Sequence, residues 1–189
     1  MGKEIKKYLL KLARKTIADK LDLEFELDEA RPTDSVLNEK RGVFVTLELN
    51  HNLRGCIGNI SPVYTLEDGV KRNAINAAFH DPRFTPLTQL EFDEIEIEIS
   101  VLTVPKKLDY KNSDDLKEKL IPLKDGVIIK KGYYEATYLP QVWEDLADKD
   151  QFLSSLCMKA GLPPDEWQKG KLEVFTYQAE AFKEKNPGI

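Results

Sequence analysis

The chain of 189 residues has room for one compact domain or two small lobes, and a chain of this length buries roughly 70% of its unfolded surface without a disulfide or metal. Hydrophobic residues at 41% and charged residues at 32% are typical of an ordinary soluble globular protein that is somewhat rich in charge. The net charge of -5 argues against a general nucleic-acid binder, because phosphate binding requires a basic field.

The sequence indicates a cytoplasmic location. No apolar stretch approaches the length of a membrane span, and the first residues, Met1 to Lys7, lack the apolar core of a secretory signal. Cys56 and Cys157 lie far apart in the sequence, and we interpret them as free thiols in a reducing compartment.

The N-terminal third predicts a helix, a loop and a hairpin. Apolar side chains recur at helical spacing over Lys3–Lys20 with lysines opposite, which predicts an amphipathic helix. The acidic stretch 22–38 contains Pro32 and is expected to be a loop. Strict alternation over Gly42–Leu49 predicts a strand, and Leu53–Ile60 is expected to return beside it after a turn.

The register of this hairpin follows from matching polarity and size across the two strands. A three-residue loop at positions 50–52 predicts these pairs: Leu49 with Leu53, Glu48 with Arg54, Leu47 with Gly55, Thr46 with Cys56, Val45 with Ile57 and Phe44 with Gly58. A two-residue loop is disfavoured because it sets Leu47 against Arg54. Arg54, Cys56 and Gly58 are therefore predicted to share one face of the hairpin.

The rest of the chain predicts an α+β fold with mostly antiparallel sheet. Thr65 is the expected N-cap of a helix that ends near His80, since Asp81-Pro82 disfavours its continuation. The remaining expected elements are a strand at 94–102, a short helix capped by Ser113 and running to Leu120, a hairpin of 126–130 and 133–139, helices at 142–147 and 151–160, and a strand that begins within 171–182.

Cys56 is the first candidate for chemistry. It lies between Gly55 and Gly58, which remove side chains that would shield the sulfur, and two residues after Arg54, a cation that favours a thiolate. In the alternative interpretation the glycines admit a neighbouring element and Cys56 is a small buried filler. The sequence leaves both open.

The run His80-Asp81-Pro82-Arg83-Phe84 is the second candidate. His80 is a possible general base for the thiol, because a Cys–His pair is the minimal nucleophilic unit. Alternatively, His80 ends a helix and Arg83 braces the loop by pairing with Asp81. His51 is expected to be a solvated turn residue.

The sequence predicts neither a metal site nor a cofactor. The two histidines and two cysteines lack metal-ligand spacing, and there is no phosphate-binding glycine loop. Cys157 lies in an apolar helical run and is expected in the core.

Several runs, in order along most of the chain, resemble the AMMECR domain family. They are Gly42–Leu47, Leu53–Gly58, Asp81–Phe84 with Pro86-Leu87, Ile99–Leu102, Leu139–Val142 and Leu156–Leu162. The resemblance implies one domain over 1–189 with two lobes. The larger lobe contains both chain ends and a mostly antiparallel sheet flanked by helices, and a smaller lobe is inserted in it. The Leu53–Gly58 run, which is the signature run of the family, is expected near the cleft between the lobes.

The resemblance implies no assigned reaction, and the sequence does not decide whether the protein is an enzyme. We expect a protein that binds a small ligand or a partner at the Leu53–Gly58 run, with thiol-based chemistry at Cys56 and Arg54 as its catalytic form. The expected ligand contacts are Arg54, Gly55, Cys56, Gly58, His80, Arg83 and Gln141. The resemblance also implies an alternative, a non-catalytic accessory protein of a Memo-type protein and a radical S-adenosylmethionine protein. A nucleic-acid-associated role is a third hypothesis, which the acidic balance disfavours.

Overall fold

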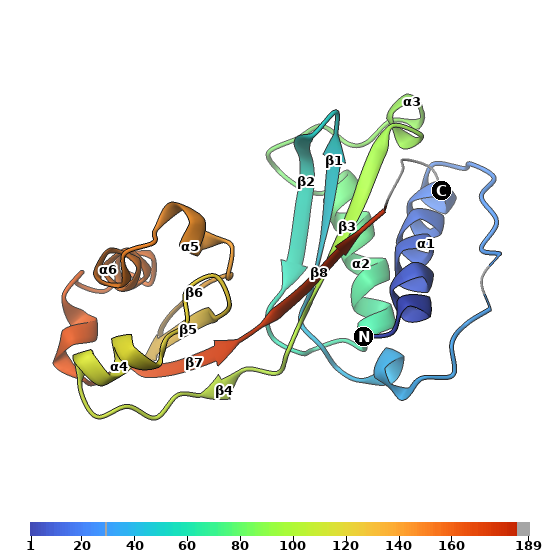
Figure 1. Ribbon diagram of the computed structural model, residues 1–189. Helices are drawn as coiled ribbons and strands as arrows, with labels where there is room; N and C mark the ends of the chain where they lie inside the picture. The colour runs from blue at the N-terminus through green and yellow to red at the C-terminus, as the bar shows by residue number, and fades with distance from the viewer. Residues whose placement is uncertain (29, 185–189) are drawn as a thin grey trace. The chain divides into compact units, whose positions relative to one another are not determined.

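The computed structural model describes residues 1–28 and 30–184 and shows an α+β protein (Figure 1). Over these residues the strands form two four-stranded sheets, in which the β1–β2, β1–β3, β4–β7, β5–β6 and β5–β7 pairs are antiparallel. This confirms the predicted fold class. The described residues divide into two compact units, one of 1–102 together with 180–184 and one of Thr103–Ala179.

The first unit contains one sheet with the strand order β2-β1-β3-β8. Its elements are α1 (Lys3–Lys20), the 3-10 helix η1 (Ser35–Asn38), β1 (Val43–Leu49), β2 (Asn52–Asn59), α2 (Leu66–Phe79), α3 (Gln89–Phe92), β3 (Ile95–Leu102) and β8 (Ala179–Lys183). The helix over 3–20 is confirmed to the residue, whereas η1 lies in a stretch that was expected to be all loop.

The two long helices pack on one face of this sheet (Figure 1). Val43, Val45 and Leu47 point into the resulting core and are fully buried, as the alternation of β1 predicts. The other face of the sheet, here called the polar face, carries the alternate residues of each strand. They are Phe44, Thr46 and Glu48 on β1, Cys56 and Gly58 on β2, and Glu96, Glu98 and Ser100 on β3.

The predicted start and end of α2 are confirmed. Thr65 is the N-cap, and its side-chain oxygen accepts a hydrogen bond from the backbone N–H of Asp68 at 3.2 Å. His80 is the C-cap residue, and the following Asp81-Pro82 turns the chain away.

The register of the β1–β2 hairpin is as predicted from Phe44 to Leu47 but wrong beyond it. Leu49 pairs with Asn52 and Glu48 with Leu53, so the loop has two residues and Arg54 is an extra residue in a β-bulge. The turn residues Asn50 and His51 have φ of 52° and 62°, the positive values of the two-residue turn whose twist matches a hairpin. The three-residue loop was predicted because a two-residue loop would pair Leu47 with Arg54. The bulge leaves Arg54 without a strand partner, so the two-residue loop forms without that pair.

A buried ion pair joins α1 to the end of β8. Arg14 is fully buried, and its Nε and Nη2 donate to the two carboxylate oxygens of Glu184 at 2.8 and 2.6 Å. The remaining donors of the guanidinium reach the carbonyls of Phe92 and Ile95, and Glu184 also accepts from the Ile97 N–H. Because every charged atom has a partner, this pair is compatible with the interior of the first unit.

The second unit contains the sheet β4-β7-β5-β6 with helices packed on it (Figure 1). Its elements are β4 (Lys106–Lys107), α4 (Ser113–Lys119), β5 (Gly126–Lys131), β6 (Tyr134–Tyr138), α5 (Val142–Asp145), α6 (Lys149–Lys159), the 3-10 helix η2 (Glu166–Lys169) and β7 (Glu173–Tyr177). In its core Trp143 stacks on Phe152 with ring centroids 3.5 Å apart, and Cys157 is fully buried as predicted.

Two expectations for this part of the chain need correction. The N-cap of α4 is Asn112 and not Ser113, because the Asn112 side chain reaches the backbone N–H of Asp115 at 2.9 Å. The strand expected within 171–182 is two strands of different sheets, β7 and β8, separated by Gln178 alone.

Candidate functional site

The candidate site centres on Cys56 in β2, an edge strand of the first unit's sheet. Cys56 is half-buried and pairs with Thr46 on β1, as the predicted register requires. The Thr46 hydroxyl donates to the Cys56 sulfur at 3.3 Å, so the two side chains touch across the strands on the polar face. This contact gives the sulfur a defined position.

The backbone of Cys56 is held from the edge of the sheet by the ion pair of Asp81 and Arg83. The Cys56 N–H donates to Asp81 Oδ2 at 2.9 Å, and Arg83 Nη2 donates to the Cys56 carbonyl at 3.3 Å. An edge strand leaves alternate N–H and C=O groups without a strand partner. Here two side chains from the loop after α2 are the hydrogen-bond partners of the N–H and C=O of Cys56. We call this arrangement the Asp81–Arg83 clamp.

Asp81 is the buried half of the clamp. Its side chain is 1% exposed, and besides the Cys56 N–H it accepts the Arg83 Nε at 3.0 Å, the Arg83 Nη2 at 2.7 Å and the Arg83 backbone N–H at 3.1 Å. The Arg83 guanidinium, followed by the backbone N–H of Cys56, holds the pKa of the Asp81 carboxyl well below its usual range, although burial acts in the opposite direction. The pairing of Arg83 with Asp81 confirms the bracing interpretation of this loop.

Arg54 is bound to α3. Its Nε and Nη2 donate to Glu91 Oε1 and Oε2 at 2.8 and 3.2 Å, and Nη2 also reaches the Pro86 carbonyl at 3.4 Å. The bulge at Arg54 breaks the regular alternation on which its predicted face was based, and its side chain reaches Glu91 on α3. The Arg54 hydrogen bond is the main reason that the pKa of Glu91 is lowered to about 2.

Phe84 lies between the two ion pairs. The Arg54 and Arg83 guanidinium carbons are 5.9 and 5.4 Å from its ring centroid, within the range of cation–π contacts. The ring therefore links the Arg54–Glu91 pair to the Asp81–Arg83 clamp.

The two glycines of the signature run are both places of close approach. A Cβ on Gly55 would lie 2.1 Å from the Ala77 carbonyl oxygen of α2, so only glycine lets the helix pack this closely. A Cβ on Gly58 would lie 2.2 Å from the Phe44 ring, which covers this glycine across the strands. Their role as ligand contacts stays a prediction.

His80 and Gln141 complete the predicted set. His80 is exposed, and its Nδ1 lies 3.1 Å from Asn76 Oδ1 one turn earlier in α2. No hydrogen bond joins His80 to Cys56 in the part of the chain that the structure describes, and its place at the end of α2 agrees with the helix-end interpretation. Gln141 is exposed and precedes α5 in the second unit. The ligand-binding roles of both residues stay predictions.

Comparison with known proteins decides the family. The family model for AMMECR1 matches residues 10–182. The chain belongs to the AMMECR1 family. It is 43% identical over 184 residues to "Protein MK0488" of Methanopyrus kandleri, covering 95% of this chain and 88% of that protein. It is 42% identical over 180 residues to "Protein NEQ441" of Nanoarchaeum equitans, covering 93% and 98%.

A solved structure of the same kind supports the fold of this AMMECR1-family chain. The crystal structure of the uncharacterized protein PH0010 from Pyrococcus horikoshii matches it with a TM-score of 0.83 and 37% identity, over 99% of this chain and 95% of that one. The resemblance inferred from the signature runs is thus confirmed.

Sequence reasoning on this AMMECR1-family chain did not predict how three residues, Thr46, Asp81 and Glu98, are placed around Cys56. Thr46 was paired with Cys56 in the predicted register but was not considered as a contact of the sulfur. Asp81 was considered for its side-chain chemistry, not as an acceptor for the backbone of β2. Glu98 pairs with Thr46 from β3, so the three strands place Cys56, Thr46 and Glu98 in one row on the polar face. Burial, followed by the charge of Glu48, raises the pKa of Glu98.

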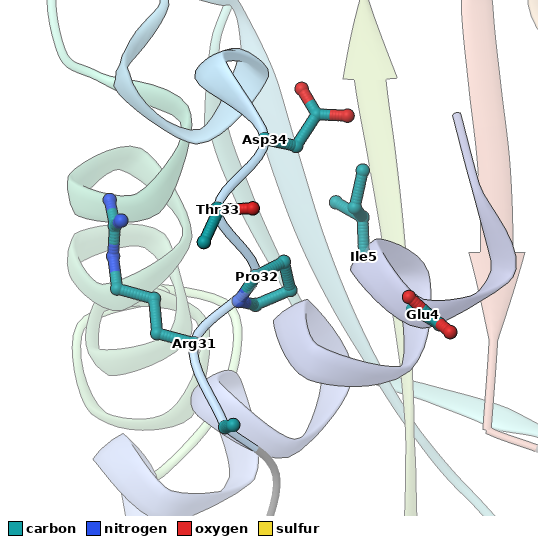
Figure 2. A pocket seen from close by; sticks show the side chains of 7 residues that line it. Glu4, Ile5, Arg31, Pro32, Thr33 and Asp34 are labelled. Carbon is teal, nitrogen blue, oxygen red and sulfur yellow. The ribbon is translucent and has the colours of Figure 1, made fainter.

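A separate hollow of about 630 Å³ lies in the first unit between the start of α1 and the loop before η1 (Figure 2). It is lined by Glu4, Ile5, Ala30, Arg31, Pro32, Thr33 and Asp34. It includes none of the predicted site residues.

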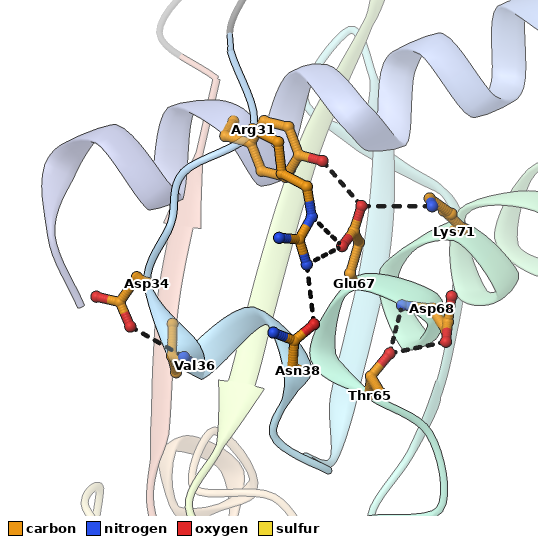
Figure 3. A network of polar contacts seen from close by, with 9 residues as sticks. Arg31, Asp34, Val36, Asn38, Thr65, Glu67, Asp68 and Lys71 are labelled. Carbon is orange, nitrogen blue, oxygen red and sulfur yellow. Dashed lines mark hydrogen bonds and ion pairs between the residues drawn. The ribbon is translucent and has the colours of Figure 1, made fainter.

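An ion-pair network holds this loop in place (Figure 3). Arg31 Nε donates to Glu67 at 2.9 Å and Nη2 donates to Asn38 at 2.9 Å, while the Tyr8 hydroxyl donates to Glu67 at 2.9 Å. Burial and the Glu67 carboxylate raise the pKa of Tyr8 to about 12. We therefore assign the Arg31–Glu67 network a structural role.

The described residues, 1–28 and 30–184, contain no group of three or more His, Cys, Asp or Glu side chains placed to hold a metal ion. They also contain no helix that is both long and apolar enough to span a membrane.

Proposed function

We propose that this AMMECR1-family protein binds a small ligand at Cys56, in the cytoplasm. The observation that carries the proposal is the way Cys56 is held. Its backbone N–H and C=O are both fixed by the Asp81–Arg83 clamp, and its sulfur is fixed by Thr46. A cysteine that only fills space in a core needs none of these contacts. Cys157, which is fully buried in an apolar cluster, is that kind of cysteine.

Thiol chemistry is the catalytic form of this proposal. The Cys56 sulfur would form a bond to an acyl or alkyl carbon, the leaving group would depart with its bonding electron pair, and the thiol proton would pass to solvent. The half-buried position of Cys56 supports access to a small electrophile.

Site-resolved alkylation tests the proposal. The native protein is treated with iodoacetamide, and the modification of each cysteine is followed over time by mass spectrometry. We expect Cys56 to react much faster than Cys157, because burial closes off the Cys157 thiol and raises its pKa. Alkylation of Cys56 at the slow rate of Cys157 would show that the sulfur is closed to ligands and would refute the proposal.

A second candidate is the accessory role, in which the chain docks on a Memo-type protein or a radical S-adenosylmethionine protein. Leu53 on the hairpin is 44% exposed and Leu90 on α3 is 89% exposed. The ion pair between their sequence neighbours Arg54 and Glu91 joins these two elements. These two exposed leucines, on elements that an ion pair joins, are the feature of the first unit that supports a docking surface.

Co-purification distinguishes this candidate. We expect Leu90→Asp to reduce recovery of either partner with the tagged protein, because it places a charge on the apolar surface. Thr85→Asp, at an exposed position of the preceding loop, is the matched control. Failure of the unaltered chain to recover either partner would contradict the accessory role.

A further inference from the structure

The exposed half of the Asp81–Arg83 clamp is a cation fixed next to Cys56. The Arg83 side chain is 53% exposed, whereas that of Asp81 is 1% exposed. Arg83 Nη2 lies 3.3 Å from the Cys56 carbonyl oxygen, which places the guanidinium at the residue that carries the thiol. The two charges therefore form an oriented pair whose positive end faces solvent beside Cys56.

Arg83 also has donors to spare. Its Nε and Nη2 are used by Asp81 and by the Cys56 carbonyl, but the structure describes no protein partner for its Nη1 group. Because the other edge of the guanidinium is held by a buried carboxylate and its plane by the Phe84 ring, Nη1 is presented in a fixed direction. Little rotamer freedom is lost when an anion binds there.

Arg54 is less suited to the same task. Its side chain is 11% exposed, against 53% for Arg83, and two of its nitrogens are engaged by Glu91 on α3. The sequence assigned the cation beside Cys56 to Arg54, whereas the accessible guanidinium next to the Cys56 backbone belongs to Arg83. Arg54 fixes α3 to the hairpin, and Arg83 supplies the accessible positive charge.

The charge of the surroundings limits the kind of anion. Glu48, Glu96 and Glu98 lie on the polar face with Cys56, and among them Lys183 pairs with Glu96 at 3.3 Å and Glu48 at 3.8 Å. A doubly charged phosphate at Cys56 would be repelled by these carboxylates, whereas a single carboxylate at the strand edge is matched by the one free group of Arg83.

We propose that Arg83 is the anion-binding residue of the Cys56 site and that the ligand is a small molecule with a single carboxylate. This inference rests on the proposed function at Cys56. It adds to that function the class of ligand and the residue that selects it.

Two probes that differ in charge test the inference. Iodoacetate carries a carboxylate and iodoacetamide is its neutral counterpart, and both alkylate a thiol by displacing iodide. The quantity measured is the rate of alkylation of Cys56 by iodoacetate divided by its rate of alkylation by iodoacetamide, with both rates read by mass spectrometry. The same ratio in the urea-unfolded chain is the reference. In the native protein we expect the ratio to rise about fivefold over the reference, the size of effect that a nearby partly screened charge produces. We expect 0.5 M NaCl to abolish most of that rise, because it shortens the Debye length.

Substitutions separate the role of the charge from that of the fold. Arg83→Gln is expected to return the ratio to the reference, while Arg83→Lys, which retains the positive charge, keeps part of the preference. Arg72→Gln is the matched control, because it removes an exposed arginine of the same unit that stacks on Tyr64 away from Asp81. Circular dichroism checks that each variant is folded. The wild-type ratio and its salt dependence test the inference even if a variant does not fold, because they need no substitution.

The outcomes separate this inference from the proposed function. If iodoacetamide does not reach Cys56, the proposed function fails. If iodoacetamide reacts but iodoacetate shows no preference over the unfolded reference, only the assignment of Arg83 and the carboxylate ligand is overturned. An equal fall of the ratio in Arg72→Gln and Arg83→Gln would also overturn it, because the effect would then belong to the general surface charge.

Discussion

Replacing Asp81 by Asn removes the negative charge of the Asp81–Arg83 clamp and leaves the side chain nearly the same shape. Each carboxylate oxygen accepts two N–H groups, Oδ1 from the backbone and Nε of Arg83 and Oδ2 from Cys56 N and Arg83 Nη2. An amide keeps one oxygen and turns an NH₂ group toward the other two donors, so two hydrogen bonds are lost in either orientation. At about 1 kcal/mol for each, with up to about 1 kcal/mol for the half-exposed ion pair, we expect a loss of about 2–3 kcal/mol in the free energy of unfolding.

Urea unfolding followed by far-ultraviolet circular dichroism measures this loss. Both tryptophans, Trp143 and Trp167, belong to the second unit, so circular dichroism is preferable to tryptophan fluorescence for a change in the first unit. Asp93→Asn is the matched control, because Asp93 is exposed in the same unit and such changes stay within about 0.5 kcal/mol. If Asp81→Asn unfolds at the same urea concentration as Asp93→Asn, the clamp contributes nothing and the reasoning is refuted.

The dependence on pH gives an independent check of the same prediction. The pKa of Asp81 is lowered in the folded protein, so its contribution to stability is complete above its unfolded pKa of about 3.9 and is lost as the pH falls toward the folded value. The stability difference between wild type and Asp81→Asn should therefore narrow in acid. A difference that is constant from pH 6 to pH 2 would show that the charge of Asp81 is not its source.

Two further predictions concern the packing and the second ion pair near Cys56. Gly55→Ala should cost up to about 3 kcal/mol in urea unfolding, because the new methyl group meets the backbone oxygen of Ala77. Gly69→Ala should cost less than Gly55→Ala, because its methyl group meets a Val43 side-chain atom at 2.7 Å instead of backbone and alanine favours the helix by about 1 kcal/mol, which offsets part of the clash. Because the pKa of Glu91 is lowered to about 2 in the folded protein, the stability that its ion pair with Arg54 contributes should be lost as the pH falls from about 4.3 to 2. The fall in thermal midpoint over this range should be smaller in Glu91→Gln, and an equal fall in both proteins would contradict the assignment.

The sequence predicted those parts of the fold that local patterns determine. The helix over 3–20, the cap at Thr65 and the pairing of Thr46 with Cys56 all follow from periodicity or capping chemistry, and all are confirmed. The bulge at Arg54 was missed because a favourable partner for its charge, Glu91, lies 37 residues further on. Without that partner in view, a three-residue loop that pairs Arg54 with Glu48 is the better local solution.

The candidate site was predicted only in its residue types. Asp81, Arg83 and Cys56 were each singled out, but the contact of Asp81 with the backbone of Cys56 depends on β2 being an edge strand. The order of strands in a sheet is decided by long-range packing, which no local pattern reports. For the same reason the passage of the chain from β7 to β8 was missed, because Gln178 carries no turn signal.

The ion pair of Arg14 and Glu184 has a consequence for the order in which this chain folds during synthesis. The two residues are 170 positions apart, so Arg14 leaves the ribosome long before its counter-charge is made. Until then Arg14 must stay hydrated and β3 lacks its neighbour β8, so the unit begun first is completed last. The whole of Thr103–Ala179 is synthesised in the interval and is able to form its own core. A chain that is truncated just before Glu184 and released from the ribosome should therefore have a folded inserted unit and an N-terminal segment that still binds chaperones.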